Sequence, residues 1–202
     1  MVVTGVWDDD VERANATAEQ LNATVANDLD AMWSDESTPT VVICTETNRH
    51  EDVVLSAAAA GKHMFVEKPL GIAAADAYRM ADAIDRAGVL FQTGYFNRGF
   101  AIHRFLKAQV AQGAFGQVTR YRQSNCHSGS LRRIFDAGWL WMTDMEQAGV
   151  GAVGDLGTHA LDIMMWIMGD VDRVTAALGV AVDNYDGCDE YGEGLMVFKN
   201  GV

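Results

Sequence analysis

The fold is decided by the stretch Ala60-Gly61-Lys62-His63-Met64-Phe65-Val66-Glu67-Lys68-Pro69-Leu70-Gly71. The glycine at 61 is expected to end a helix, and an apolar strand over 64–66 follows it. That strand ends in the charged pair Glu67-Lys68, which is costly unless the carboxyl end of the strand opens into a cleft. Ligands of open parallel sheets bind at this edge. The stretch therefore predicts a ligand site at Glu67 and Lys68, with a solvated ion pair before the Pro69 turn as the alternative.

Strands and helices alternate on both sides of this stretch as far as residue 94. Strand patterns cover 2–7, 40–45, 64–66 and 89–93, and helix patterns cover 11–21, 29–33, 51–60 and 73–87. Such alternation indicates βαβ units and a parallel sheet, so an α/β fold is expected. The segment 40–45 is continuously apolar, which is typical of a strand that is covered on both faces.

After Gly94 the pattern changes to that of an α+β domain. Helices are predicted over 101–112 and 154–168, and strands over 171–182 and 195–198. The alternation over 117–124 favours an antiparallel strand, and 125–147 has the composition of a loop. The sequence therefore predicts two domains, residues 1–94 and residues 95–202.

Composition narrows the class of protein. The 202 residues are 49% apolar, and no apolar run reaches the 18 residues that a membrane span needs. A net charge of −13 repels nucleic acid and anionic membranes. The three scattered cysteines favour a reducing compartment, here the cytoplasm, and no metal centre. An Asp-rich, Lys-poor surface resembles that of proteins from salt-loving organisms, with an ordinary acidic enzyme as the alternative.

The helix predicted over 154–168 is apolar nearly all round, so it should be buried. Asp155, His159 and Asp162 nevertheless share one stripe of it, at positions i, i+4 and i+7. Buried polar groups are paired or take part in chemistry. A carboxylate one turn away would raise the basicity of His159 and fix its tautomer. The alternative is a core histidine that Asp155 satisfies.

A glycine-rich run precedes this helix and mimics a dinucleotide fingerprint. Gly149-Val150-Gly151-Ala152-Val153-Gly154 matches G-x-G-x-x-G. That fingerprint must follow a buried strand inside a βαβ unit, and residues 141–148 are no such strand. The run is therefore interpreted as a close-packed loop that opens the helix of His159.

Taken together, four motifs resemble one family. They are Thr45-Glu46-Thr47-Asn48-Arg49-His50, Ala60-Gly61-Lys62-His63 leading to Glu67-Lys68-Pro69-Leu70, Gly94-Tyr95-Phe96-Asn97-Arg98, and Gly154-Asp155-Leu156-Gly157-Thr158-His159 with Asp162. In this order they resemble the glucose–fructose oxidoreductase / inositol dehydrogenase (Gfo/Idh/MocA) family. The resemblance implies an incomplete Rossmann-type parallel sheet over 1–94, then an α+β domain over 95–202 with a mostly antiparallel sheet. It also implies NAD(P)-dependent hydride transfer on a sugar or cyclic polyol, by a homo-oligomer.

The resemblance further implies a role for each residue at a matching position. The residues implied to contact the dinucleotide are Asp8 at the adenosine ribose, Thr45, Asn48 and His50 along the pyrophosphate and nicotinamide side, and Glu67 and Lys68 beside the nicotinamide ribose. The implied catalytic group is Lys68, Asp155 and His159, and Arg98 is implied to lie near the substrate. In this scheme His159 is the base for the hydroxyl proton, and Lys68 stabilises the developing alkoxide. Asp8 favours ribose hydroxyls over a 2′-phosphate, so NAD is expected, with NADP as the alternative.

Two departures from the family pattern affect these expectations. Glu46 stands where the family usually has proline, and the first strand with its glycine-rich phosphate loop is not found ahead of Asp8. The chain is therefore expected to be a fragment that lacks the first βα unit and part of the carboxyl-terminal sheet. Two other hypotheses stay open: a non-catalytic sugar- or nucleotide-sensing protein of the same fold, and an inactive truncated product.

Overall fold

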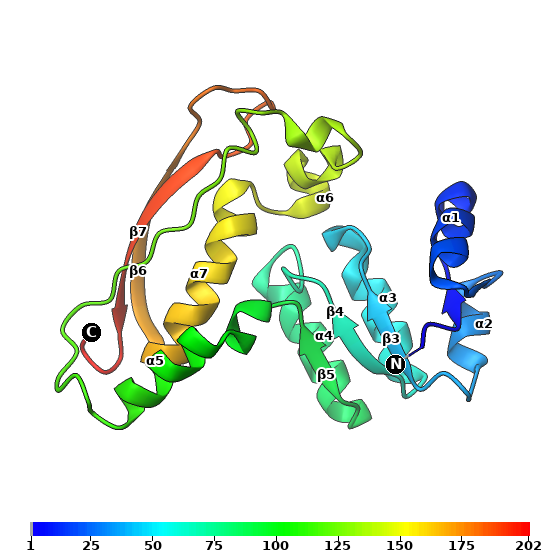
Figure 1. Cartoon of the computed structure of the whole chain (residues 1–202), viewed down its shortest axis with the longest axis horizontal. Coiled ribbons are helices and arrows are strands. Elements are labelled where there is room, and N and C mark those ends of the chain that lie inside the picture. The colour runs from blue at the N-terminus through cyan, green and yellow to red at the C-terminus, as the bar shows by residue number, and fades with distance from the viewer. Residues whose placement is uncertain (1) are drawn as a thin grey trace.

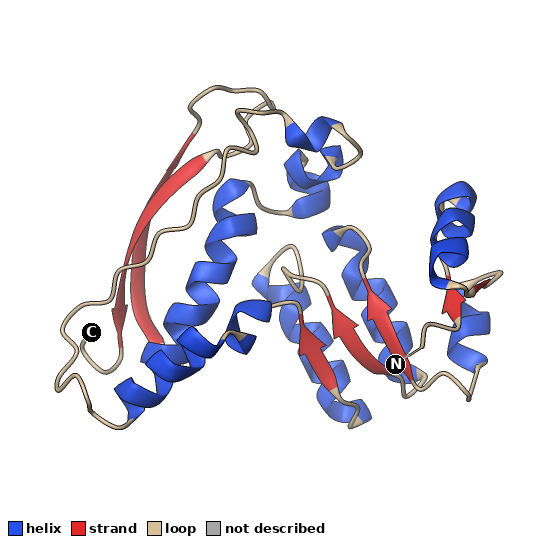
Figure 2. Ribbon diagram, viewed as in Figure 1, coloured by secondary structure: helices blue, strands red, loops and turns tan. Residues whose placement is uncertain are grey.

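The computed structural model describes residues 2–202 and has two parts, as Figure 1 shows. The first part holds short parallel strands with helices between them. The second holds a long helix, α7, that lies against an antiparallel pair of strands, β6 and β7. Figure 2 shows that parallel strands occur in the first part and antiparallel strands in the second. The predicted α/β fold followed by an α+β arrangement is confirmed.

The central sheet is parallel, in the order β3 (Thr40–Ile43), β4 (His63–Val66) and β5 (Phe91–Thr93). Its register aligns the last residues of the three strands, because Ile43 pairs with Val66 and Val66 with Thr93. The chain segments that follow the three strands therefore leave the sheet at one edge. This edge is where the charged pair after β4 was predicted to open into a ligand site.

One face of the central sheet is buried under α3 (His50–Ala59) and α4 (Ala74–Ala87). The residues that form this core are Val41, Ile43, Val53, Val54, Ala57, Ala58, Met64, Val66, Met80 and Ile84. Val42 points the other way and is 54% exposed. The expectation that this strand is covered on both faces is therefore wrong, because α3 and α4 lie on the same side of it.

The first two strands form a separate parallel pair, β1 (Gly5–Val6) and β2 (Thr24–Val25), flanked by α1 (Val11–Leu21) and α2 (Leu29–Ser34). β1 and β3 belong to different sheets, and Figure 1 shows a gap between them. Only side chains are seen to link the two sheets in the described residues, as in the ion pair of Asp9 and Arg49 at 2.5 Å. The Rossmann-type sheet is thus interrupted, as expected from the first strand that is not found ahead of Asp8.

In the second part, α5 (Ala101–Ala111) and α7 (Ala152–Met168) pack with β6 (Val171–Gly179) and β7 (Tyr191–Phe198). Their core is Ile163, Ile167, Met168 and Phe198. β6 ends earlier than the predicted 182, because the Glu190 carboxylate accepts the N–H groups of Ala181 and Val182 at 2.7 and 2.6 Å. Those groups cannot then join the ladder between the two strands.

The strand predicted over 117–124 is wrong. Figure 2 draws this segment as a loop that runs past the sheet. Two of its apolar residues, Val118 and Tyr121, do pack against the core of α7 and β7. These contacts hold the segment against the core without a partner strand, since no strand pairing for it is seen in residues 2–202.

The segment expected to be a loop over 125–147 holds short helical turns. They are η3 (Ile134–Asp136), η4 (Leu140–Thr143) and α6 (Met145–Ala148). Asp144 caps α6 by accepting the Glu146 N–H at 2.8 Å. None of the helices in residues 2–202 combines the length and the apolar composition that crossing a membrane requires.

A buried lysine ties the loop before β3 to the sheet. Lys62 is 4% exposed, and its ammonium donates to the carbonyl oxygens of Asp35 and Thr38 at 2.6 and 2.9 Å.

We expect Lys62→Met to lower the free energy of unfolding by about 1–3 kcal/mol, because both carbonyls lose their donor. Urea denaturation measures this change. Lys199→Met is the control, since that side chain is exposed and its ion pair with Asp170 contributes little. Equal effects of the two substitutions would contradict the prediction.

Candidate active site

The predicted ligand edge brings Glu67 and Gly94 together. Glu67 follows β4 directly, and its carboxylate accepts the N–H of Lys68 at 3.1 Å. Gly94 follows β5, and a Cβ atom at this position would lie 2.6 Å from Oε2 of Glu67. The carboxylate of Glu67 therefore occupies the space that a side chain at position 94 would take.

An ion pair joins the two parts of the chain at this edge. The ammonium of Lys68 is bound to the carboxylate of Asp155 in the first turns of α7. The two side chains are 15% and 21% exposed, so the pair is largely withdrawn from water. Two residues of the predicted catalytic group are thus in direct contact. His159, the third, lies one helical turn further along α7.

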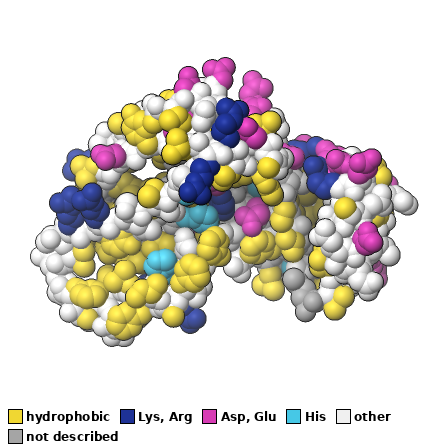
Figure 3. Space-filling model, turned by 45° about the horizontal axis from the view of Figure 1, so that its top comes forward, with side chains coloured by type: hydrophobic (Ala, Val, Ile, Leu, Met, Phe, Trp, Pro, Cys, Tyr) yellow, Lys and Arg dark blue, Asp and Glu magenta, His cyan; other side chains and the backbone are white. Residues whose placement is uncertain are grey.

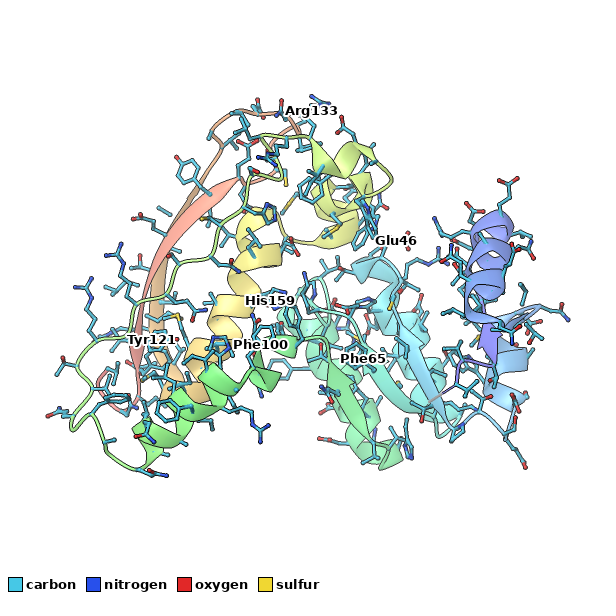
Figure 4. All side chains as sticks on the ribbon, viewed as in Figure 1. Glu46, Phe65, Phe100, Tyr121, Arg133 and His159 are labelled. Carbon is cyan, nitrogen blue, oxygen red and sulfur yellow. The ribbon has the colours of Figure 1, made fainter. Side chains whose placement is uncertain are left out.

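His159 is enclosed by aromatic rings. It is 9% exposed, and the rings of Phe96 and Tyr95 lie 5.1 and 6.0 Å from its own, in edge-on arrangements. Phe96 belongs to the turn η2 (Phe96–Gly99), which leads into α5. Figure 4 shows His159 projecting from α7 toward the segment that carries Phe100. The hydroxyl of Tyr95 meets that of Thr158 at 2.7 Å and fixes the wall beside the imidazole.

The expected hydrogen bond between Asp155 and His159 is not formed. Nδ1 of His159 is buried and has no hydrogen-bond partner among the described residues. The carboxylate of Asp155 binds Lys68 instead, because an ammonium attracts it more strongly than a neutral ring does. Both the prediction that Asp155 fixes the tautomer and the alternative of a core histidine satisfied by Asp155 are therefore wrong.

The pKa of His159 is also shifted against expectation. Burial lowers the pKa of this imidazole, and the nearby charge of Lys68 lowers it further, while Asp155 raises it less. The sequence had suggested a more basic ring. The observed environment keeps the imidazole neutral at neutral pH, so one ring nitrogen can accept a proton.

Arg98 has a partner that the sequence did not reveal. Its guanidinium Nε donates to both carboxylate oxygens of Asp162, at 3.0 and 2.9 Å, and Nη2 also binds this carboxylate. The side chain of Asp162 is 6% exposed, and the guanidinium lies 5.7 Å from the ring centre of Trp166. The guanidinium of Arg98, which was implied to lie near the substrate, therefore binds Asp162 and anchors η2 to α7.

Outside the central sheet, Asp8 follows β1 of the separate β1–β2 pair and accepts from Nε and Nη2 of Arg13 at 2.6 and 2.7 Å. The Arg13 guanidinium holds the pKa of this carboxyl below its usual value. Asn48 is exposed in the turn η1 (Thr47–Arg49), and Thr45 lies between it and β3. These are the positions at which the resemblance implied contacts to a dinucleotide.

His50 does not line a ligand as predicted. Its ring is 1% exposed, Nε2 faces the carbonyl oxygen of Thr45 at 3.1 Å, and Nδ1 faces those of Pro69 and Leu70 at 3.2 and 3.1 Å. Both nitrogens therefore face backbone carbonyl oxygens, and a neutral ring donates its one N–H to one of the two segments. The prediction of a direct contact between this side chain and the dinucleotide is wrong.

The glycine-rich run opens the helix of His159, but it is not a loop throughout, because α7 already begins at Ala152. Gly149 closes α6 in the left-handed conformation, at φ +74°. Gly151 leaves room for Asp189, whose carboxylate accepts the N–H groups of Gly151 and Val153 at 3.1 and 2.8 Å. Asp189 thus caps the start of α7 from another loop. Sequence reasoning missed this residue, since an aspartate in a polar turn carries no local signal of a distant helix end.

A narrow cleft adjoins the ion pair of Lys68 and Asp155. Its lining residues are Thr47, Lys68, Pro69, Trp141, Met142, Ala148, Val150 and Asp155. Trp141 and Met142 come from the segment expected to be an unpatterned loop, so they were also missed. The cleft shows that this segment covers the ion pair from the side of the second part.

An NAD molecule can be tested against these residues. The hydroxyl oxygens of Thr45 and Thr93 are buried without a hydrogen-bond partner in the described chain, and both lie where strands β3 and β5 end. Unsatisfied hydroxyls at the carboxyl edge of a parallel sheet, with Asp8 after a strand of the separate β1–β2 pair, suit a polar dinucleotide. The residues present therefore fit this cofactor.

Known proteins resemble the chain along its whole length. Residues 1–95 match the model described as "Oxidoreductase family, NAD-binding Rossmann fold", and residues 103–202 match the GFO/IDH/MocA C-terminal domain. D-glucoside 3-dehydrogenase of Escherichia coli (strain K12) is 30% identical over 196 residues, 95% of this chain and 54% of that protein. Myo-inositol 2-dehydrogenase of Thermotoga maritima is 30% identical over 176 residues, 85% of this chain and 49% of that protein.

A solved structure shows the same fold. Levoglucosan dehydrogenase in complex with NADH and levoglucosan superposes with a TM-score of 0.86 at 23% identity, over 100% of this chain and 56% of that one. The chain spans about half the length of the curated relatives it matches. Because family models match both of its parts, the chain belongs to the Gfo/Idh/MocA family of NAD-binding oxidoreductases.

Proposed function

We propose that the native protein is an NAD-dependent dehydrogenase that oxidises a hydroxyl group of a sugar or cyclic polyol. The observation that carries this proposal is the grouping of the Lys68–Asp155 ion pair and the enclosed His159 at the carboxyl edge of the sheet. The names of two relatives, D-glucoside 3-dehydrogenase and myo-inositol 2-dehydrogenase, support this substrate class.

Each side chain in this group has a chemical task. His159 accepts the proton of the substrate hydroxyl, because burial and Lys68 keep its imidazole neutral. Lys68 stabilises negative charge on the substrate oxygen, and Asp155 holds the ammonium of Lys68 in place. Asp8, Thr45, Asn48 and Glu67 bind the dinucleotide. NAD, when bound, supplies the hydride acceptor.

The proposal is tested by incubating the native protein with NAD and a panel of pyranosides, anhydrosugars, inositols and acyclic polyols. Formation of NADH is followed by its absorbance, and binding of NADH is measured separately by fluorescence. We expect NADH formation with at least one cyclic substrate. A protein that binds NADH but oxidises no member of the panel overturns the proposal and favours the sensing protein of the same fold.

Cofactor choice gives a second prediction. We expect kcat/KM to be higher with NAD than with NADP, because the carboxylate of Asp8 repels a 2′-phosphate. Asp8→Ser should reduce this preference roughly 10- to 100-fold, since it also releases Arg13 to bind the phosphate. The control is Glu12→Gln, an exposed substitution in α1 next to Arg13. It should leave the ratio of kcat/KM for NAD to kcat/KM for NADP unchanged. A wild-type preference for NADP would contradict the role given to Asp8.

The proposal extends to the organisation of the native protein. It divides the chain into a dinucleotide-binding domain, residues 1–94, and a domain for substrate and subunit contacts, residues 95–202. The native protein is proposed to be a homo-oligomer in the cytoplasm. That compartment is reducing, which suits an odd number of scattered cysteines.

Adaptation to salt is also proposed. The formal net charge is −13, and Figure 3 shows acidic side chains (magenta) spread over the upper and right-hand parts of one face. Salt screens repulsion between like charges, so we expect the melting temperature to rise between low and molar KCl. Thermal unfolding followed by circular dichroism measures the change. A falling melting temperature would contradict adaptation to salt and would leave the enzymatic proposal untouched.

A further inference from the structure

We propose that His50 is the positioning residue for Lys68, because its buried ring lies between the chain after β4 and the end of the neighbouring strand β3 and faces backbone carbonyl oxygens of both. This inference rests on the proposed function, in which Lys68 acts on the substrate oxygen. It gives a task to a buried polar ring that the proposed chemistry does not otherwise use.

The first observation is the placement of the imidazole between two chain segments. Nε2 faces the carbonyl oxygen of Thr45, two residues beyond β3, and Nδ1 faces those of Pro69 and Leu70, just after Lys68. The ring is 1% exposed, so water does not compete for these contacts. His50 is also the first residue of α3, whose packing under the sheet fixes its backbone.

The second observation is how the rest of this turn is held. The carboxylate of Asp76 accepts the N–H groups of Ile72 and Ala73 at 2.8 and 2.9 Å, and that of Glu67 accepts the N–H of Lys68 at 3.1 Å. These contacts secure N–H groups only. Among the described residues, His50 alone places a polar side-chain atom within hydrogen-bond distance of the carbonyl oxygens of Pro69 and Leu70, so it restrains the side of the turn that Asp76 and Glu67 leave open.

The consequence for chemistry follows from distance. The ammonium of Lys68 must meet both Asp155 and the substrate oxygen, and Asp155 stands on a different part of the chain. A displacement of about 1 Å of a positioned group can lower a rate by roughly 100-fold. A turn that drifts away from β3 would therefore reduce turnover while leaving the adenosine end of the cofactor site intact.

The test compares His50→Ala with His63→Ala in the native protein. His63 is a matched control, because its Nδ1 accepts the N–H of Leu90 at 3.1 Å and so links two strands of the same sheet at the opposite edge. Three quantities are measured on folded protein: kcat, the dissociation constant of NADH, and amide hydrogen exchange of the peptide that covers residues 67–73.

We expect His50→Ala to lower kcat roughly 10- to 100-fold, with NADH affinity within about threefold of wild type and faster exchange confined to residues 67–73. His63→Ala should lower stability and leave kcat per folded molecule within about threefold.

If His50→Ala does not fold, the same three quantities are measured on His50→Asn, because the amide of asparagine can still donate to one of the two segments. Unchanged exchange at 67–73, or equal losses of kcat in the two histidine variants, overturns the proposal. If the wild-type protein turns over no substrate, the proposed function fails, while the exchange measurement still decides whether His50 holds the turn.

Discussion

His159→Ala is expected to lower kcat for sugar or polyol oxidation by roughly 100- to 10,000-fold, the usual loss when a positioned general base is removed. The dissociation constant of NAD should change little, because the imidazole acts on the hydroxyl proton and not on the dinucleotide. Steady-state kinetics, expressed per folded molecule, and NADH fluorescence titration measure the two quantities separately.

Packing complicates this experiment, because the ring of His159 fills the space beside Phe96 and Tyr95. Alanine leaves a cavity there and should also lower the free energy of unfolding by about 2–4 kcal/mol. His159→Gln keeps more of the volume but has no base of suitable strength, so it should lose activity with less loss of stability. Near-wild-type turnover in either folded variant would remove His159 from the proposed chemistry and favour the sensing protein.

Lys68→Met is expected to lower kcat by roughly 100- to 1,000-fold, because the substrate oxygen loses its stabilising charge. It should also weaken NAD binding, since Lys68 is proposed to lie beside the nicotinamide ribose. The carboxylate of Asp155 is left without its partner, and its attraction for a proton on His159 is no longer opposed.

The pH dependence of this variant separates its role from simple damage. Lys68 lowers the pKa of His159, so its removal raises that pKa, and the acid limb of the kcat profile should move to higher pH. Asp155 raises the same pKa, so Asp155→Asn should move the limb to lower pH. Lys199→Met, an exposed change far along the chain, should move neither limb. Shifts in the same direction for Lys68→Met and Asp155→Asn would contradict the proposed electrostatics.

Local patterns predicted the elements well. The helix predicted over 11–21 is observed as α1, where Ala14 and Ala18 are buried at helical spacing, and glycine at 88 ends α4 in the left-handed conformation. These features depend on residues a few positions apart, within the reach of helix periodicity and capping chemistry. The placement of Glu67 and Lys68 at the carboxyl edge of a parallel sheet followed from the same kind of reasoning.

Pairings between distant residues could not be predicted in this way. Asp155 binds Lys68, 87 positions away, in preference to His159 on its own helix. Arg98 meets Asp162 across 64 positions, and no periodicity records which charges face each other after folding. The false strand over 117–124 has the same cause, since a local pattern does not specify a partner strand.

The ion pair of Lys68 and Asp155 also bears on how activity would be lost on heating. Its two members come from parts of the chain that have separate cores. If the parts separate slightly while each core stays intact, the ammonium and the carboxylate lose contact before any helix or strand melts. The proposed catalytic group is thus assembled only where the two parts meet, and inactivation would precede loss of secondary structure.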